Sequence, residues 1–359
     1  MQHTEIQDLV KSVVNDLGPM KFTQLAQSMQ NYYVYPTLFK RGKMKFKSGT
    51  EITDRVLLNT AGAARNVELY ENDVVNVADG LAEVKAPFRH TNTAWLLEDH
   101  EVEMNKSPNE LLDLIKTRRE QALIDLAEVL ETNYFGAPTS STDGKTPWGL
   151  FYWLVKPTET AAADASDGFN GGNPTGFTDV GGLSADAWKN YTSCYHSVPN
   201  FSNGGTDTKG DFIRRLRKAY RKTAWVSPLG GQEYGKTFTH NMRIFCNYAT
   251  LGLIEDLLES SNDNLTSDVS PLFGKTTFKG VPFEPLNILD SDSDNPVYGV
   301  NADTIQLYGL RGFFMREAQP KDLPNNHLVS VIHIDNSYNW VCTDRRRNFV
   351  MKQVSTFTN

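Results

Sequence analysis

One long amphipathic segment limits what this chain can fold into. In "SPNELLDLIKTRREQALIDLAEVLETNYFG", Ser107 is placed to cap a helix, Pro108 suits its first position and Glu110 completes a capping box. Apolar residues then recur near a 3.6-residue period until Gly136, which suits a helix stop: Leu111, Leu112, Ile115, Ala122, Leu126, Val129 and Leu130. About 28 residues at 1.5 Å each give roughly 40 Å of helix. Because no second segment has this length, the pattern argues against a helix bundle. It predicts one long helix that lies across a β-sheet as a strut.

Two extended runs precede this helix and enclose an acidic span. The runs are "TEITDRVLLN" and "LAEVKAPFRHTNTAWLLEDHEV". Between them, residues 66–83 contain no lysine or arginine and five acids: Glu68, Glu71, Asp73, Asp79 and Glu83. This arrangement predicts a long hairpin or a projecting loop, with an ordinary solvated loop as the alternative.

The N-terminal part of the chain ends in a basic segment that has little core of its own to pack against. Residues 1–35 are weakly helical and amphipathic, and "KRGKMKFK" at residues 40–47 carries five positive charges. We therefore expect an arm that must lie on something else.

The second half alternates between irregular, helical and extended segments. Residues 156–182 are rich in glycine, proline, threonine and aspartate, which predicts a loop or linker and a subdomain boundary. Two amphipathic helices are predicted, at residues 211–225 and 243–260, and strands return from residue 276. Since strands and helices do not alternate regularly, the predicted class is α+β.

Size and composition narrow the class of protein further. The chain has 359 residues, which suits two or three packed subdomains. Its formal net charge of −7 argues against a dedicated nucleic-acid-binding protein but allows a local basic site. Cys194, Cys246 and Cys342 lack metal-ligand spacing, which favours a reducing cytoplasm. No apolar run is long enough to predict a membrane span.

Catalytic motifs are absent from the sequence. It contains no GxSxG, no HExxH, no Walker A loop and no GxGxxG after a strand. His100 has acidic neighbours in Asp99 and Glu101, but adjacent residues on a strand point to opposite faces and cannot converge on a metal. His333 lies in an apolar strand and is predicted to be a core histidine.

One acidic segment resembles the start of a calcium loop. In "DSDSDN", residues 290–295, Asn295 stands where an EF-hand needs glycine, and Asn301 stands where it needs glutamate. A surface turn is therefore predicted. We expect no catalytic residue, no cofactor and no metal, although a soluble hydrolase that uses a pair of acids stays open as an alternative.

Positive charges gather in two places. "CTDRRRNFVMKQV" reads as a strand entered through Arg345, Arg346 and Arg347. The helix at 211–225 has a basic face: Arg214, Arg215, Arg217, Lys218, Arg221 and Lys222. Such a face is either solvated, bound to nucleic acid or bound to an acidic protein surface. Because the chain carries its own acidic span, packed copies could pair the acids of one with the arginines of the next. Each exposed ion pair gives only about 0.2–1 kcal/mol, so these pairs would set register more than strength.

An ordered set of segments runs through about residues 165 to 350. It comprises "GFNGGNPTGF", "WKNYTSCY", "DFIRRLRKAYRKTAWVSP", "SNDNLTSDV", "FKGVPFEPL", "PVYGVN" and "CTDRRRNFV". In this order and spacing, the second half of the chain resembles the major capsid proteins of tailed bacteriophages. The first half resembles them in its arrangement of arm, extended loop and long helix.

The resemblance implies a Hong Kong 97-like capsid fold with four parts. Residues 1–45 would be an N-terminal arm, and residues 46–104 an extended loop with flanking strands. Residues 105–155 and 326–359 would form a peripheral subdomain around the long helix. Residues 156–325 would form the axial subdomain at the capsomer centre.

The resemblance also implies a function without a reaction. Copies of the chain would form homo-pentamers and homo-hexamers of an icosahedral shell around double-stranded DNA, assembled in the host cytoplasm and found in the virion. It implies a separate scaffolding protein and a portal, leaves a decoration protein open, and involves no membrane. An encapsulin-like compartment that encloses enzymes is the related alternative.

The residues expected at contacts between subunits follow from the charge pattern and the resemblance together. The basic candidates are Arg345, Arg346 and Arg347 in the triplet and Arg214, Arg215 and Arg217 on the helix. The acidic candidates on a neighbouring copy are Glu68, Glu71 and Asp73, with pairing inside one chain as the alternative. The negative net charge implies only weak contact with packaged DNA.

Overall fold

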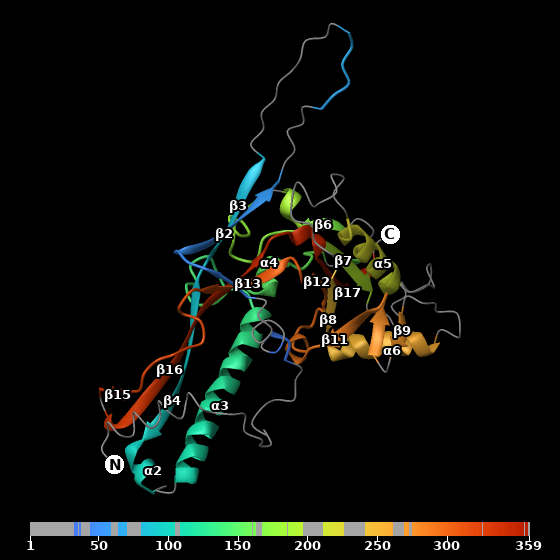
Figure 1. The fold of residues 1–359 in the computed structure, drawn as a ribbon. Helices are drawn as coiled ribbons and strands as arrows, with labels where there is room; N and C mark the ends of the chain where they lie inside the picture. Colours follow the sequence, from blue (N-terminus) through green and yellow to red (C-terminus); the bar gives the residue numbers. More distant parts are fainter. Residues whose placement is uncertain are drawn as a thin grey trace. The chain divides into compact units, whose positions relative to one another are not determined.

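The computed structural model (Figure 1) divides the chain into two compact units. The long-helix unit comprises residues 1–50, 88–134 and 307–339, and the eight-stranded unit comprises residues 51–87, 135–306 and 340–359. The structure describes residues 32–34, 36, 44–58, 64–69, 80–104, 108–159, 161–162, 167–184, 186–196, 211–225, 241–260, 269–272, 275–324, 326–354 and 356–357.

The elements within the described residues follow in chain order (Figure 1). The α-helices are α2 Asp99–Met104, α3 Pro108–Tyr134, α4 Leu150–Trp153, α5 Asp211–Thr223 and α6 Tyr248–Ser260. The 3₁₀ helices are η3 Asp186–Trp188, η5 Asn287–Leu289 and η6 Arg345–Arg347. The strands are β1 Lys45–Lys47, β2 Glu51–Leu57, β3 Leu81–Pro87, β4 Arg89–Glu98, β5 Ala161–Ala162, β6 Gly168–Gly171, β7 Asn190–His196, β8 Met242–Cys246, β9 Val269–Leu272, β10 Lys275–Phe278, β11 Val281–Pro285, β12 Val297–Asn301, β13 Ile305–Leu310, β14 Arg316–Glu317, β15 Lys321–Leu323, β16 Asn326–Cys342, β17 Phe349–Val354 and β18 Thr356–Phe357.

The long-helix unit confirms the predicted strut. Helix α3 has 27 residues and runs beside β4 and β16, which pair antiparallel (Figure 1). One side of α3 is buried, including Ile115, Ala122, Leu126 and Leu130, and β4 contributes Trp95 and Leu97 to the same core. Val129, which was predicted on this face, is exposed. Ser107 lies outside the described residues.

The eight-stranded unit is built around a mixed sheet in the order β6-β7-β17-β12-β8-β11-β10-β9. Strand β17 pairs parallel with β7 and antiparallel with β12, so this strand from near the C-terminus lies inside the sheet. Helix α5 packs on β7 through its apolar face. The core of the unit includes Tyr191, Tyr195, Phe212, Leu216, Ile244, Phe349 and Met351.

The predicted hairpin is confirmed for its first part. Strands β2 and β3 pair antiparallel, from Glu51 with Pro87 to Leu57 with Leu81. The second extended run is not one strand, however, because its continuation β4 pairs with β16 in the long-helix unit. The expected single piece at residues 46–104 is therefore divided at residue 87.

Two further predicted boundaries are wrong. Residues 340–359 do not belong with the long helix, because β17 is a central strand of the other unit. Residues 156–182 were predicted as a loop or linker and as a subdomain boundary; their described residues are largely irregular, as expected of a loop, but they lie inside one unit, and Gly171 and Gly181 are tightly packed. A side chain at Gly171 would lie 2.0 Å from Asn190, and Gly181 has a positive φ of 65° against Trp153. The divisions fall instead after Tyr134 and after Gln306.

The N-terminal arm packs on its own chain wherever the structure describes it. Strand β1 pairs parallel with β13, from Lys45 with Tyr308 to Lys47 with Leu310. Glu131 on α3 accepts the backbone N–H groups of Tyr33 at 2.9 Å and Val34 at 2.7 Å. Burial raises the pKa of the Glu131 carboxyl, against the lowering effect of these hydrogen bonds. These segments thus have partners within their own chain, whereas the sequence predicted an arm that lies on something else.

The predicted helix at 243–260 is a strand followed by a helix. Met242–Cys246 forms β8, and α6 starts only at Tyr248. Asn247 marks the change, because its side-chain oxygen accepts the backbone N–H of Thr250 at 2.8 Å. This is the N-cap arrangement that favours asparagine.

Candidate functional site: the arginine turn, the basic helix and a cavity

The arginine triplet lies in a 3₁₀ turn between β16 and β17, not at the start of a strand. Asp344 begins the turn, and its carboxylate accepts the backbone N–H of Arg346 at 3.0 Å. A second oxygen of the same carboxylate lies 3.4 Å from Nε of Arg347. Burial raises the pKa of Asp344, although both arginines favour its charged form. The tight turn gives the three arginine side chains different surroundings.

Arg345 is an internal residue, with a relative exposure of 1%. Its Nε donates to the backbone oxygen of Trp153 at 2.6 Å. Its Nη2 donates to the oxygen of Gly172 at 3.1 Å and to the side-chain oxygen of Asn190 at 3.0 Å. Burial lowers the pKa of Arg345 to about 10, so the guanidinium stays charged at neutral pH. The prediction that Arg345 pairs with another subunit is wrong, because its donors already hold three segments of its own unit together.

Arg346 and Arg347 both lie against Trp225. Their guanidinium carbons are 4.9 Å and 4.6 Å from the indole ring centroid, which is the geometry of a cation–π contact. Arg347 is nearly buried, which argues against a contact with another subunit. The Arg346 side chain is 40% exposed and is therefore the member of the triplet that faces outward.

The basic side chains of helix α5 are likewise partly buried and partly exposed. Arg215 is buried and its Nη1 lies 2.7 Å from the equally buried Asp167 carboxylate, so this predicted contact residue is also internal. Lys218 reaches the other Asp167 oxygen at 2.9 Å. Arg214 is exposed and Arg217 is half-buried. They line a basic surface hollow together with Lys218, Arg221 and Lys222.

The acidic candidates are only partly described. Glu68 is exposed within the described segment 64–69, between the exposed side chains of Val67 and Leu69. Glu71 and Asp73 lie outside the described residues. The carboxylate that lies beside Arg346 and Arg347 is that of Asp344, which was not among the predicted acids.

A cavity of about 420 Å³ opens beside the arginine turn at the loop end of the β2–β3 hairpin. Its apolar lining comes from Val56, Leu57, Leu58, Leu81, Ala187, Trp188 and Trp225. Its polar lining comes from Arg55, Thr343, Asp344 and Arg346. The indole N–H of Trp225 is buried and has no acceptor among the described residues. Sequence analysis missed this cavity, because its lining residues come from five separate parts of the chain.

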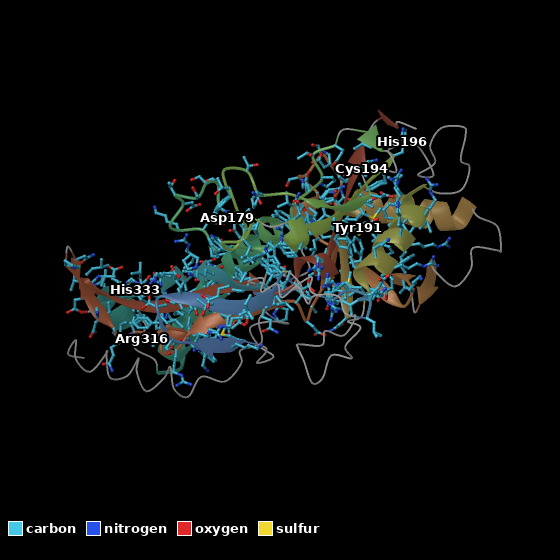
Figure 2. All side chains as sticks on the ribbon, turned by 90° about the horizontal axis from the view of Figure 1, so that it is seen from above. Asp179, Tyr191, Cys194, His196, Arg316 and His333 are labelled. Carbon is cyan, nitrogen blue, oxygen red and sulfur yellow. The ribbon has the colours of Figure 1, made fainter. Side chains whose placement is uncertain are left out.

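The other candidate sites have ordinary structural explanations. In the turn at 290–295, the carboxylates of Asp292 and Asp294 face the ammonium groups of Lys156 and Lys352, as they would face a cation. His333 is half-buried rather than in the core; it lies on β16, next to the strand that carries Arg316 (Figure 2). Across the described residues, no cluster of three or more histidines, cysteines or acids could hold a metal ion. No helix among them is long and apolar enough to cross a membrane.

Comparison with known proteins finds similar structures but no similar sequence. No protein-family model matches the sequence, and no curated protein matches it. The cyanophage A-1(L) capsid matches with a TM-score of 0.57 and 14% identity, over 94% of this chain and 97% of that chain. The capsid of a native GTA particle matches with a TM-score of 0.54 and 11% identity, over 95% and 96%. The mature capsid of bacteriophage PhiM1 matches with a TM-score of 0.51 and 12% identity, over 94% and 91%. The chain has the fold of these phage capsid proteins.

The capsid fold extends over nearly the whole chain, so it includes both units. These neighbours are structural proteins of particles.

Proposed function

We propose that this chain is the major capsid protein of a tailed bacteriophage, a structural protein that builds the shell of a virion. The observation that carries the proposal is the match of its fold to phage capsid proteins over at least 94% of its length. The exposed loop segment and the outward-facing basic residues are features of a chain that has contacts to make with other copies.

The shell consists of homo-pentamers and homo-hexamers in icosahedral arrangement and encloses double-stranded DNA. The net charge of −7 supports a wall that contacts the packaged DNA only weakly, since like charges repel. Assembly takes place in the host cytoplasm with a separate scaffolding protein and a portal.

Contacts between copies use the basic residues that remain at the surface. These are Arg346 in the turn and Arg214 and Arg217 on α5, and they meet acids of the neighbouring loop: Glu68, Glu71 and Asp73. Such pairs orient subunits during assembly more than they hold the shell together.

Electron microscopy of the purified full-length protein tests the proposal. Closed shells or ring-shaped capsomers are expected. The variant R346E should fold normally but assemble poorly, whereas a chain that stays monomeric at every concentration and salt condition contradicts the proposed function. Shells that contain enzymes instead of DNA would assign the chain to an encapsulin-like compartment.

A further inference from the structure

Helix α5 carries a continuous row of positive charge on the side away from its buried face. The row lines a surface hollow of about 520 Å³ and consists of Arg214, Arg217, Lys218, Arg221 and Lys222. Residues spaced by three, four, seven and eight positions lie on one face of a helix. The opposite face of α5 is buried and includes Phe212, Leu216 and Ala219. The row therefore belongs to the surface of the eight-stranded unit.

This row is unfavourable for the helix on its own. Like charges four residues apart on a helix repel each other, and the row contains three such pairs: Arg214 with Lys218, Arg217 with Arg221, and Lys218 with Lys222. The helix dipole favours cations in the last turn, which holds Arg221 and Lys222, but it disfavours Arg214 in the first turn. The dipole therefore does not account for the whole row, whereas a bound polyanion would remove the repulsion.

The carboxylate beside this row is already neutralised. The Asp167 side chain is buried and lies 2.7 Å from Nη1 of Arg215 and 2.9 Å from Nζ of Lys218. Arg221 and Lys222 are exposed, and neither forms an ion pair with a described residue. These two cations are therefore available to an external anion.

A second element brings another cation to the same surface. Lys279 lies in the turn between β10 and β11, and its Nζ is 5.5 Å from the ring centroid of Tyr220 on α5. Tyr220 is three residues from Arg217 and is therefore its neighbour on the helix surface. Lys279 has a φ of 49°, which residues other than glycine rarely adopt. Since glycine or asparagine would suit this turn better, the lysine indicates that its charge is useful there.

The lining of the hollow favours a phosphate backbone over an acidic protein segment. Among the described residues, only basic side chains line the hollow. The core of a protein–protein interface is depleted of charged residues, whereas arginine and lysine are the usual partners of DNA phosphates. The net charge of −7 does not prevent such a contact, because charges more than about 8 Å away are largely screened at physiological ionic strength.

We propose that this basic face of α5 binds the phosphate backbone of double-stranded DNA. Arg221 and Lys222 contact phosphates, and Lys279 adds to the local positive potential. Because phosphates carry no sequence information, the contact is independent of base sequence. This inference rests on the proposed shell function and assigns the weak contact with packaged DNA to named residues. Arg214 and Arg217, at the other end of the row, remain for contacts between copies.

Fluorescence anisotropy with unassembled full-length subunits tests the inference. The probe is a labelled DNA duplex of about 30 base pairs, and binding is measured from about 50 to about 200 mM NaCl. The test variant is R221Q/K222Q. The matched control, R311Q/K321Q, removes two charges at exposed positions of the long-helix unit, so both variants have the same net charge. Thermal unfolding checks that both variants are folded.

Each phosphate contact that is lost reduces the slope of log K against log salt by about 0.9. R221Q/K222Q should therefore reduce the slope by about 1.8, whereas R311Q/K321Q should keep the slope of the wild type. Over a fourfold rise in salt, wild-type binding should then weaken about twelvefold more than binding by R221Q/K222Q.

Equal slopes in the two variants overturn the inference. Tighter binding of poly-glutamate than of the duplex, at equal concentration of negative charge, also overturns it and assigns the face to an acidic protein. Subunits that build normal shells but do not bind the duplex reject this site alone. Subunits that bind the duplex with the expected slopes but never assemble reject the proposed shell function instead.

Discussion

Replacing Arg345 with methionine should destabilise the subunit much more than the same change at Arg346. Methionine keeps an apolar stem of similar length but removes every donor of the guanidinium. The oxygens of Trp153 and Gly172 then lose a hydrogen bond inside the protein, while Asn190 still accepts the backbone N–H of Val155 at 3.2 Å. Each buried acceptor left without a donor costs about 1–3 kcal/mol. Since the buried charge is removed as well, we expect a net loss of about 2–4 kcal/mol.

Urea unfolding of unassembled subunits, followed by tryptophan fluorescence, measures this loss. Trp153 and Trp340 are fully buried in the same unit, so their emission should report its unfolding. R346M is the matched control and should change the free energy of unfolding by less than about 1 kcal/mol, because that side chain is partly exposed. Equal losses in R345M and R346M would refute the internal role that the structure gives to Arg345.

Three further predictions concern other buried groups. D167N removes the counter-charge of buried Arg215 and should cost about 3–5 kcal/mol in urea unfolding, whereas D186N at an exposed pair should change nothing measurable. G299A places a methyl group 2.0 Å from the Phe349 ring and should cost about 1–3 kcal/mol in thermal unfolding, whereas G252A on α6, where space is open, should not destabilise. The raised pKa of Glu131 means that the folded state binds its proton more tightly than the unfolded state, so its contribution to stability falls as pH rises above the ordinary value of 4.5. E131Q should therefore gain stability relative to wild type as pH rises above 4.5, and parallel pH curves would contradict this.

Elements with strong local patterns were predictable from the sequence. The long helix and α5 follow a clear helical periodicity, and the structure places them within a few residues of the predicted bounds; the β2–β3 hairpin was predicted as well, although its second strand ends at Pro87. Local pattern decides these elements, because each buries one continuous face.

The division into units and the roles of the arginines were not predictable in this way. The glycines at 171 and 181 read as linker residues, but long-range packing against Asn190 and Trp153 requires them. Arginine is almost never fully buried, so three adjacent arginines indicate a surface. Only the contacts of Arg345 with Trp153 and Gly172, distant in sequence, reveal an internal residue.

The cavity at the candidate site could not be predicted from sequence patterns either. Its walls come from β2, β3, η3 and the arginine turn, which no sequence spacing connects.

The native mass of the purified full-length chain tests the central claim most directly. Mass photometry or sedimentation under assembly conditions should show capsomers and particles of megadalton size, because the proposed function requires many copies. A uniform species of 40.3 kDa across protein concentrations and salt conditions would contradict the account.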